Sequence, residues 1–325
     1  MAAINEFELI DRFFRRPSQS AVLGIGDDAA LVQSTPGHEI ALSVDMLVAG
    51  RHFFEDVDPE SLGYKALAVN LSDMAAMGAK PRWALLAGAL PHVESDWLAA
   101  FARGFFALAD DHGVELIGGD TTRGPLTLCV TIIGEVPRGK ALTRGGASPG
   151  DAIWLSGPLG DAALALACHS RRVELTASEF ESCQRALLRP NPRVALGERL
   201  RGVASAAIDI SDGLTGDLGH VLEASRVGAT IQLAAIPRSA VLGARMHGAR
   251  RAVAIDALLA GGDDYELCFT APAARTADVE SVGRELRLDL ASIGVVTSGT
   301  ALRVEDEAGQ ALERLPRAFD HFADY

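Results

Sequence analysis

Short apolar runs closed by Gly, Pro or Asp alternate along the chain with longer segments of helical periodicity. Runs rich in Val, Ile or Leu predict β-strands. These strands are expected at residues 21–25, 39–44, 83–89, 114–117, 126–136, 152–156 and 204–210. Helices are expected at residues 59–77, 96–112 and 214–225, and an Ala-rich helix should end near residue 169. This alternation predicts an α/β or α+β fold.

Two of the helices carry finer signals. The helix at 59–77 places Leu62, Ala66, Val69 and Met74 on one apolar side. Such spacing is typical of a helix with one face against a core. The helix at 96–112 is followed by Gly113, which suits the left-handed C-cap position.

The composition changes between Pro137 and Asp151, where glycines crowd a stretch of low hydrophobicity. We expect a domain boundary there, with one domain at residues 1–140 and a second at 141–325. Residues 1–16 mix acidic with apolar residues, which predicts an amphipathic helix and not a signal peptide. No apolar run reaches the length of a membrane span, so no membrane partner is expected.

Charge and cysteine usage narrow the function classes. The net charge of the 325 residues is −13, and the basic residues are scattered arginines with only three lysines. A nucleic-acid binder would carry a basic face, so no nucleic-acid partner is predicted. The four cysteines show no CxxC spacing and indicate reduced thiols in a cytoplasmic protein.

Aspartate recurs beside glycine or a small hydroxyl residue near apolar runs. Five segments share this pattern, at residues 24–28, 43–45, 70–73, 118–120 and 209–213. A fold that gathers so many carboxylates needs cations, and a donor set of oxygens without His or Cys favours hard ions such as Mg²⁺. Because protein-bound Mg²⁺ usually works with substrate phosphates, the pattern predicts nucleotide-phosphate chemistry.

Each segment also has a plainer interpretation. Residues 24–29 formally match the G-x-G-x-x-A dinucleotide fingerprint, but adjacent carboxylates would repel a pyrophosphate there. An Asp-rich turn is the alternative to a metal ligand. Ser43 and Asp45 share one face of a strand and can share one cation, unless they form a helix cap or a solvated strand end.

The remaining segments leave similar choices. Residues 70–73 come late in a helix, where Asp opposes the dipole; they are a functional hint or an exposed polar turn. Gly118 and Gly119 allow close approach of a ligand, with Asp120 on its ion, or they form a tight turn. Asp212 is either a metal ligand or the N-cap of the following helix.

Other catalytic motifs are missing from the sequence. There is no P-loop, no HRD or DFG pair of protein kinases, no G-x-S-x-G elbow and no H-E-x-x-H pair. A zinc hydrolase is therefore not expected.

Six segments together resemble thiamine-monophosphate kinases, in order and from about residue 5 to 325. They are residues 24–30, 43–53, 65–79, 117–122, 208–214 and 261–267. The resemblance implies the two-domain fold of aminoimidazole ribonucleotide synthetase, with N-terminal domains that pair in a homodimer. It also implies ATP-dependent phosphorylation of thiamine monophosphate to thiamine diphosphate, with several Mg²⁺ ions. Another ATP-dependent synthetase of this fold, or a non-catalytic Mg-nucleotide binder, is the alternative.

The resemblance also implies roles for single residues. Metal positions are Asp28, Ser43, Val44 through its carbonyl, Asp45, Asp73, Asp120, Asp209 and Asp212. ATP-contact positions are Gly119, Asp120, Arg144 and Ser211, and substrate positions are His52, Asp263 and Phe319. Asp263 stands where many members carry Glu, and His112 stands where a Tyr is often found near the nucleotide. No classical base is expected, because the attacking phosphate oxygen is already ionised.

Overall fold

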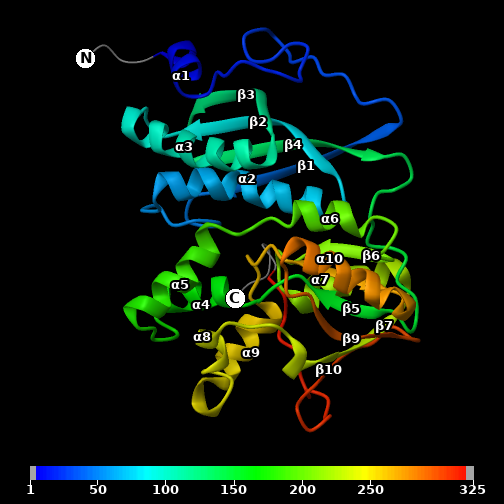
Figure 1. Cartoon of the computed structure of the whole chain (residues 1–325). Helices are drawn as coiled ribbons and strands as arrows, with labels where there is room; N and C mark the ends of the chain where they lie inside the picture. The colour runs from blue at the N-terminus through cyan, green and yellow to red at the C-terminus, as the bar shows by residue number, and fades with distance from the viewer. Residues whose placement is uncertain (1–4, 320–325) are drawn as a thin grey trace. The chain divides into compact units, whose positions relative to one another are not determined.

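The computed structural model of the chain describes residues 5–319. Two compact units make up the fold (Figure 1). One contains the chain up to Met74 together with Ala79–Gly139. The other contains Ala75–Gly78 and the chain from Lys140 onward. Both units combine helices with a β-sheet, so the predicted mixed α/β class is confirmed.

The first unit is built on a sheet with the strand order β1-β4-β2-β3. Its elements are α1 (Glu6–Phe13), β1 (His38–Val48), α2 (Pro59–Ala76), β2 (Lys80–Leu90), α3 (Ser95–His112), β3 (Glu115–Arg123) and β4 (Thr127–Pro137). Strand β4 runs antiparallel to β1 and β2, whereas β2 and β3 are parallel. Helix α3 makes the crossover that parallel neighbours require. Figure 1 shows α2 and α3 along one face of this sheet.

Helices α2 and α3 approach closely because glycine stands at the contact on both of them. A Cβ at Gly63 would lie 2.0 Å from the carbonyl oxygen of Phe101, and one at Gly104 would lie 1.8 Å from that of Glu60. Helix α2 is buried beyond its predicted apolar side, since Leu67 and Leu71 have no exposed surface. The reason is that α2 is covered by α3 as well as by the sheet.

The second unit contains a mixed sheet with the order β10-β7-β9-β5-β8-β6. Its strands are β5 (Ala152–Leu155), β6 (Ala206–Asp209), β7 (Gly228–Gln232), β8 (Leu267–Ala271), β9 (Ala291–Thr297) and β10 (Leu302–Glu305). Its helices are α4 (Asp161–His169), α5 (Ala177–Leu188), α6 (Val194–Leu200), α7 (Leu214–Ser225), α8 (Ala240–Gly243), α9 (Arg251–Ala260) and α10 (Thr276–Leu286). Helix α4 packs on α5, α8 and α9, and α7 packs on β6 and α9.

One predicted strand does not form, and two predicted strands end at other residues than expected. Residues 21–25 form no strand; they make only the isolated bridges Leu23–Leu31 and Ile25–Asp27, because this segment folds back on itself. Strand β1 continues past residue 44 to Val48, since β4 pairs with it over its whole length. Strand β3 likewise continues past residue 117 through residues 118–120, so the alternative of a tight turn there is wrong.

The N-terminal helix is shorter in the structure than in the prediction. Helix α1 covers Glu6–Phe13 of the expected residues 1–16, and residues 1–4 lie outside the described part. Asn5 and Glu8 form a capping box at its start. Among residues 5–319, no helix is long and apolar enough to cross a membrane.

Candidate active site

Ser43 and Asp45 lie on the same face of β1, which is the face turned toward α2. Burial alternates along the strand, with Ala41 and Leu47 buried on that face. The Ser43 hydroxyl donates a hydrogen bond to the carboxylate of Asp73 on α2. The structure therefore brings two predicted metal positions into contact, and the alternative of a solvated strand end is wrong. The side chain of Val44 lies on the opposite face and is 59% exposed.

The polar turn of α2 is buried, so an exposed polar turn is also wrong. Asn70 and Ser72 have no exposed surface. The Asn70 amide nitrogen donates to the Ala66 carbonyl at 3.0 Å. Its oxygen has no hydrogen-bond partner among the described residues. An unpaired buried oxygen one turn before Asp73 adds an acceptor of the type that hard cations and their waters bind.

Gly119 and Asp120 lie in the middle of β3, at neither end of the strand. Gly119 has a φ of +152°, and a Cβ there would lie 1.8 Å from the Leu86 carbonyl oxygen of β2. The glycine is required by the neighbouring strand, so its expected role in ligand approach is not needed to explain it. Asp120 is exposed beside Ala87 of β2.

A cavity of about 930 Å³ opens in the first unit. Asp28, Gly119 and Asp120 line it, so three predicted site residues share one space. One part of its wall is apolar, with Trp97 and Phe101 of α3. The cavity therefore combines carboxylates with an apolar surface of the kind that ligand sites show.

Sequence reasoning missed Arg15, which also lines this cavity. A Cβ at Gly26 would lie 2.3 Å from its guanidinium, so a glycine at 26 leaves room for Arg15. Arg15 forms an ion pair with Asp11 at 3.0 Å. Arg15 follows the end of α1 at Phe13, and the sequence offers no signal that predicts its place in the cavity.

His52 lies in the turn after β1 with its ring held by the backbone. The Val48 N–H donates to Nδ1 at 3.0 Å. A neutral imidazole that accepts at Nδ1 carries its proton on Nε2. The outer nitrogen is thus a donor, which suits an anionic ligand. At the end of α3, burial lowers the pKa of His112, against the effect of Asp111.

In the second unit, the segments 209–213 and 261–266 are joined through backbone hydrogen bonds. The Ile210 N–H donates to the Glu266 carbonyl, and the Tyr265 N–H donates to the Ile210 carbonyl, both at 2.8 Å. The Asp263 N–H donates to the Ser211 carbonyl, also at 2.8 Å. Two sequence motifs that are far apart in the chain therefore form one structural element.

The chain near residue 319 joins the same element. The Phe319 N–H donates to the Asp212 carbonyl at 3.1 Å, and the Phe319 ring is 46% exposed. Ser211, Asp212, Asp263 and Phe319 are thus brought together, as the predicted nucleotide, metal and substrate positions of this unit. Asp263 has a φ of +62°, a left-handed conformation that costs on the order of 1–3 kcal/mol and occurs at helix ends as well as at functional sites.

Two buried acidic residues next to this element, Glu266 and Asp217, were not among the predicted site residues. Glu266 is 7% exposed; it accepts from Arg193 Nε at 2.7 Å and from the Ser156 hydroxyl. Asp217 accepts the N–H groups of residues 211, 212 and 213. Burial raises the pKa of Asp217 to about 6; Asp212 adds to this effect and the N–H donors oppose it. The N-cap interpretation of Asp212 is wrong, because Gly213 is the N-cap of α7.

Asp209 is the last residue of β6, and Arg144 lies outside the strands, next to the Thr143 that contacts β6. The Ala207 N–H of β6 donates to the Thr143 carbonyl at 3.0 Å, and the Ser225 hydroxyl donates to the Arg144 carbonyl at 3.2 Å. Arg144 is exposed, whereas Asp209 is 7% exposed.

The donor set fits Mg²⁺. Within residues 5–319, no three His, Cys, Asp or Glu side chains are arranged to hold a metal ion. The contacts instead give pairs of oxygen donors, such as Ser43 with Asp73. Mg²⁺ is usually bound by one or two carboxylates together with waters and substrate phosphates, so such pairs suit it.

Comparison of the sequence with known proteins identifies the family. Residues 26–136 match the family model for the AIR synthase related protein N-terminal domain, and residues 148–307 match that for the C-terminal domain. The thiamine-monophosphate kinase of Escherichia coli is 44% identical over 325 residues, which cover 99% of each chain. That of Bacillus subtilis is 34% identical and covers 98% of this chain and 100% of its own.

Solved structures extend the likeness to the fold. The crystal structure of the thiamine-monophosphate kinase from Stenotrophomonas maltophilia has 46% identity and a TM-score of 0.84, and covers 95% of this chain and 98% of its own. A structure of AaThiL complexed with AMPPCP and TMP has 30% identity and a TM-score of 0.76. The match covers 98% of this chain and 97% of the AaThiL chain. The chain therefore belongs to the thiamine-monophosphate kinases, within the AIR synthase related family.

Proposed function

We propose that this chain transfers the γ-phosphoryl group of ATP to thiamine monophosphate and produces thiamine diphosphate and ADP. The observation that carries the proposal is the likeness over the full length to thiamine-monophosphate kinases, with the acidic motifs held in defined contacts. AaThiL is complexed with AMPPCP, an analogue of ATP, together with TMP. A related protein thus holds an analogue of the proposed donor together with TMP.

Oxygen ligands of the first unit would hold the metal ions that accompany ATP. These are Asp28, Ser43, the Val44 carbonyl, Asp45, Asp73 and Asp120. Asp209 and Asp212 would do the same in the second unit. Bound Mg²⁺ would neutralise the phosphate charge that otherwise keeps two anions apart.

The remaining roles fall to side chains with suitable chemistry. The Nε2 proton of His52 is a donor for the substrate phosphate, because Nδ1 is occupied by the backbone. Arg144 supplies a positive charge for the triphosphate. Gly119 of the first unit and Ser211 of the second unit are further proposed nucleotide contacts. The exposed face of Phe319 offers a stacking surface for the thiamine ring, with Asp263 beside it through Ser211 and Asp212. A terminal phosphate oxygen attacks the γ-phosphorus as the bond to ADP breaks, so no base is needed.

We assign ATP and Mg²⁺ binding and dimer formation to residues 1–140, with residues 141–325 contributing further metal, nucleotide and substrate contacts. Strand β1 supports the dimer, since Ile40, Leu42, Val44 and Met46 are 40–66% exposed on one face of it. An exposed row of large apolar side chains on an edge strand is typical of a protein interface. The four cysteines are free thiols, which supports a cytoplasmic location.

The test is the reaction itself, followed as thiamine diphosphate and ADP by chromatography. We expect stoichiometric products with Mg²⁺ and loss of activity with EDTA. Asp73→Ala should lower kcat on the order of 10²-fold or more, as the loss of one electrostatic stabiliser does. Asp110→Asn, which removes an exposed carboxylate on α3, is the control and should retain wild-type turnover. A wild-type protein that binds Mg-ATP but forms no thiamine diphosphate would disprove the proposed substrate.

A further inference from the structure

We infer that Asp217 is a positioning residue for the reaction, because its carboxylate holds the turn that presents Ser211 and Asp212. The inference rests on the proposed function, in which Ser211 contacts the nucleotide and Asp212 a metal ion. Asp217 itself lies on α7, behind the turn, and is 3% exposed. It acts through the backbone and not through contact with a ligand.

One oxygen of Asp217 collects three successive backbone donors. The N–H groups of Ser211, Asp212 and Gly213 donate to Oδ2 at 3.0, 3.0 and 3.1 Å. The first N–H groups of a helix and of the turn before it have no partner within the helix. Hydrogen bonds to an ionised acceptor are about twice as strong as neutral ones, so a carboxylate fixes these donors better than an amide would.

The same turn carries the other predicted ligand positions of the unit. The Ser211 carbonyl accepts from the Asp263 N–H, and the Asp212 carbonyl accepts from the Phe319 N–H. The turn thus has Asp217 on its donor side and the substrate positions on its acceptor side. A displacement of residues 211–213 would move Asp263 and Phe319 as well.

The turn has little room to relax in another direction. Gly213 has a φ of +114°, and a Cβ there would lie 2.6 Å from the Cα of Ala260 on α9. Gly262 lies equally close, since its Cβ would be 2.4 Å from the Ser211 carbonyl oxygen. Contacts with α9 and with the loop of Gly262 leave the donors of the turn aimed at Asp217.

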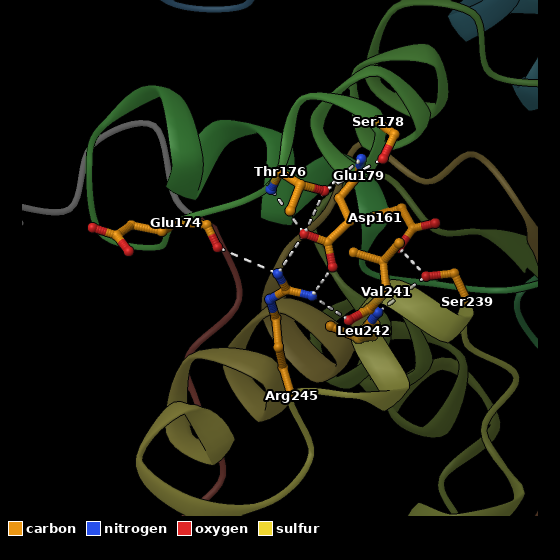
Figure 2. Close-up of polar contacts among 9 residues, drawn as sticks. All are labelled: Asp161, Glu174, Thr176, Ser178, Glu179, Ser239, Val241, Leu242 and Arg245. Atoms are coloured by element: carbon orange, nitrogen blue, oxygen red, sulfur yellow. Dashed lines mark hydrogen bonds and ion pairs between the residues drawn. The ribbon is translucent and has the colours of Figure 1, made fainter.

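A structural control is available in the same unit. Figure 2 shows Arg245, which donates to Glu179 of α5 at 2.9 and 3.0 Å and to the Val241 carbonyl at 2.7 Å. Arg245 is 5% exposed, so the Glu179 carboxylate, like that of Asp217, accepts hydrogen bonds from a buried donor group. The elements that it joins, α5 and α8, carry none of the predicted ligands. Glu179→Gln therefore tests loss of a partly buried charge-assisted contact away from the turn.

The experiment compares Asp217→Ala, Asp217→Asn and Glu179→Gln in the full chain. Mn²⁺ binding in the presence of AMPPCP is followed by electron paramagnetic resonance, which does not require turnover. We expect Asp217→Ala to raise the Mn²⁺ Kd and to lower kcat by about 10–100-fold, the effect of removing a partner that orients a metal ligand. Asp217→Asn keeps an acceptor oxygen and should restore part of both. Glu179→Gln should lower Tm while the Mn²⁺ Kd stays within about 2-fold of wild type.

Other outcomes would overturn the inference. Asp217→Ala with Mn²⁺ Kd and kcat unchanged below its Tm would make Asp217 a stabilising residue only. If Asp217→Ala does not fold, Asp217→Asn decides the matter, because an unchanged Mn²⁺ Kd and kcat would reject the need for a carboxylate at this position. Equal loss of Mn²⁺ affinity in Glu179→Gln would also reject a specific role. Failure of the wild type to form thiamine diphosphate would reject the proposed function alone, since the Mn²⁺ measurement does not depend on that substrate.

Discussion

Glu179 and Arg245 form a charged pair on elements that carry none of the predicted ligand positions. The Arg245 guanidinium and the Thr176 N–H lower the pKa of Glu179 to about 2, from an ordinary value of 4.5. Thr176 also caps α5 through a capping box with the same glutamate. Glu179 therefore joins a helix start to the segment after α8 (Figure 2).

This pair predicts acid sensitivity with a definite sign. Between pH about 4.5 and about 2, the unfolded chain binds a proton at Glu179 that the folded chain does not. The stabilisation is thus fully present above this window and is lost as the pH falls through it. We expect the difference in free energy of unfolding between wild type and Glu179→Gln to be largest near neutral pH and to shrink toward pH about 2. Urea titrations at several pH values measure it; a difference that grows on acidification would contradict the assignment.

At the scale of the elements, the contact of α2 with α3 sets how the first unit packs. Residues 70–73 of α2 reach β1 only because this helix is held between the sheet and α3. Glycine at both crossing points allows backbone-to-backbone approach, which any side chain would prevent.

Gly104→Ala should therefore destabilise the fold by about 3 kcal/mol, the upper part of the usual range for overpacking. Its Cβ would lie 1.8 Å from a backbone oxygen, which cannot rotate away as a side chain can. Gly219→Ala is the matched control, because Gly219 lies within α7 and nothing is found within 4 Å of its Cβ. The control should be neutral or stabilising by up to about 1 kcal/mol from helix propensity. Chemical unfolding followed by circular dichroism measures both; equal stabilities would exclude the close contact.

At the scale of the whole molecule, the question is how many chains assemble. Leu42 is 66% exposed in the middle of the apolar row on β1. We expect the wild type to be a homodimer and Leu42→Glu to be monomeric, because a charge at the centre of an apolar interface would lose its water without gaining a partner.

Light scattering during size exclusion measures the mass of each form. Val93→Glu is the control, since Val93 is 46% exposed but lies in the loop between β2 and α3 and not on β1. It should remain dimeric. A monomeric wild type, or a dimeric Leu42→Glu, would contradict the role of the β1 face.

The sequence alone determined most elements, the fold class and the family. Helix α3 and its cap at Gly113 follow from local periodicity and from the left-handed conformation that glycine adopts, and both are confirmed. The family and the mixed fold class are confirmed as well. These features depend on residues close in sequence or on motifs that recur in order, which a single chain displays directly.

Only the tertiary structure decided which groups each acidic residue contacts within its unit. Asp212 and Asp217 are five positions apart, yet the first carries the Phe319 contact on its carbonyl and the second anchors the turn. The absence of a strand at 21–25 and the place of Arg15 in the cavity were equally invisible beforehand. Strand pairing, burial and the partners of hydrogen bonds depend on segments far apart in the chain, so local sequence patterns do not predict them.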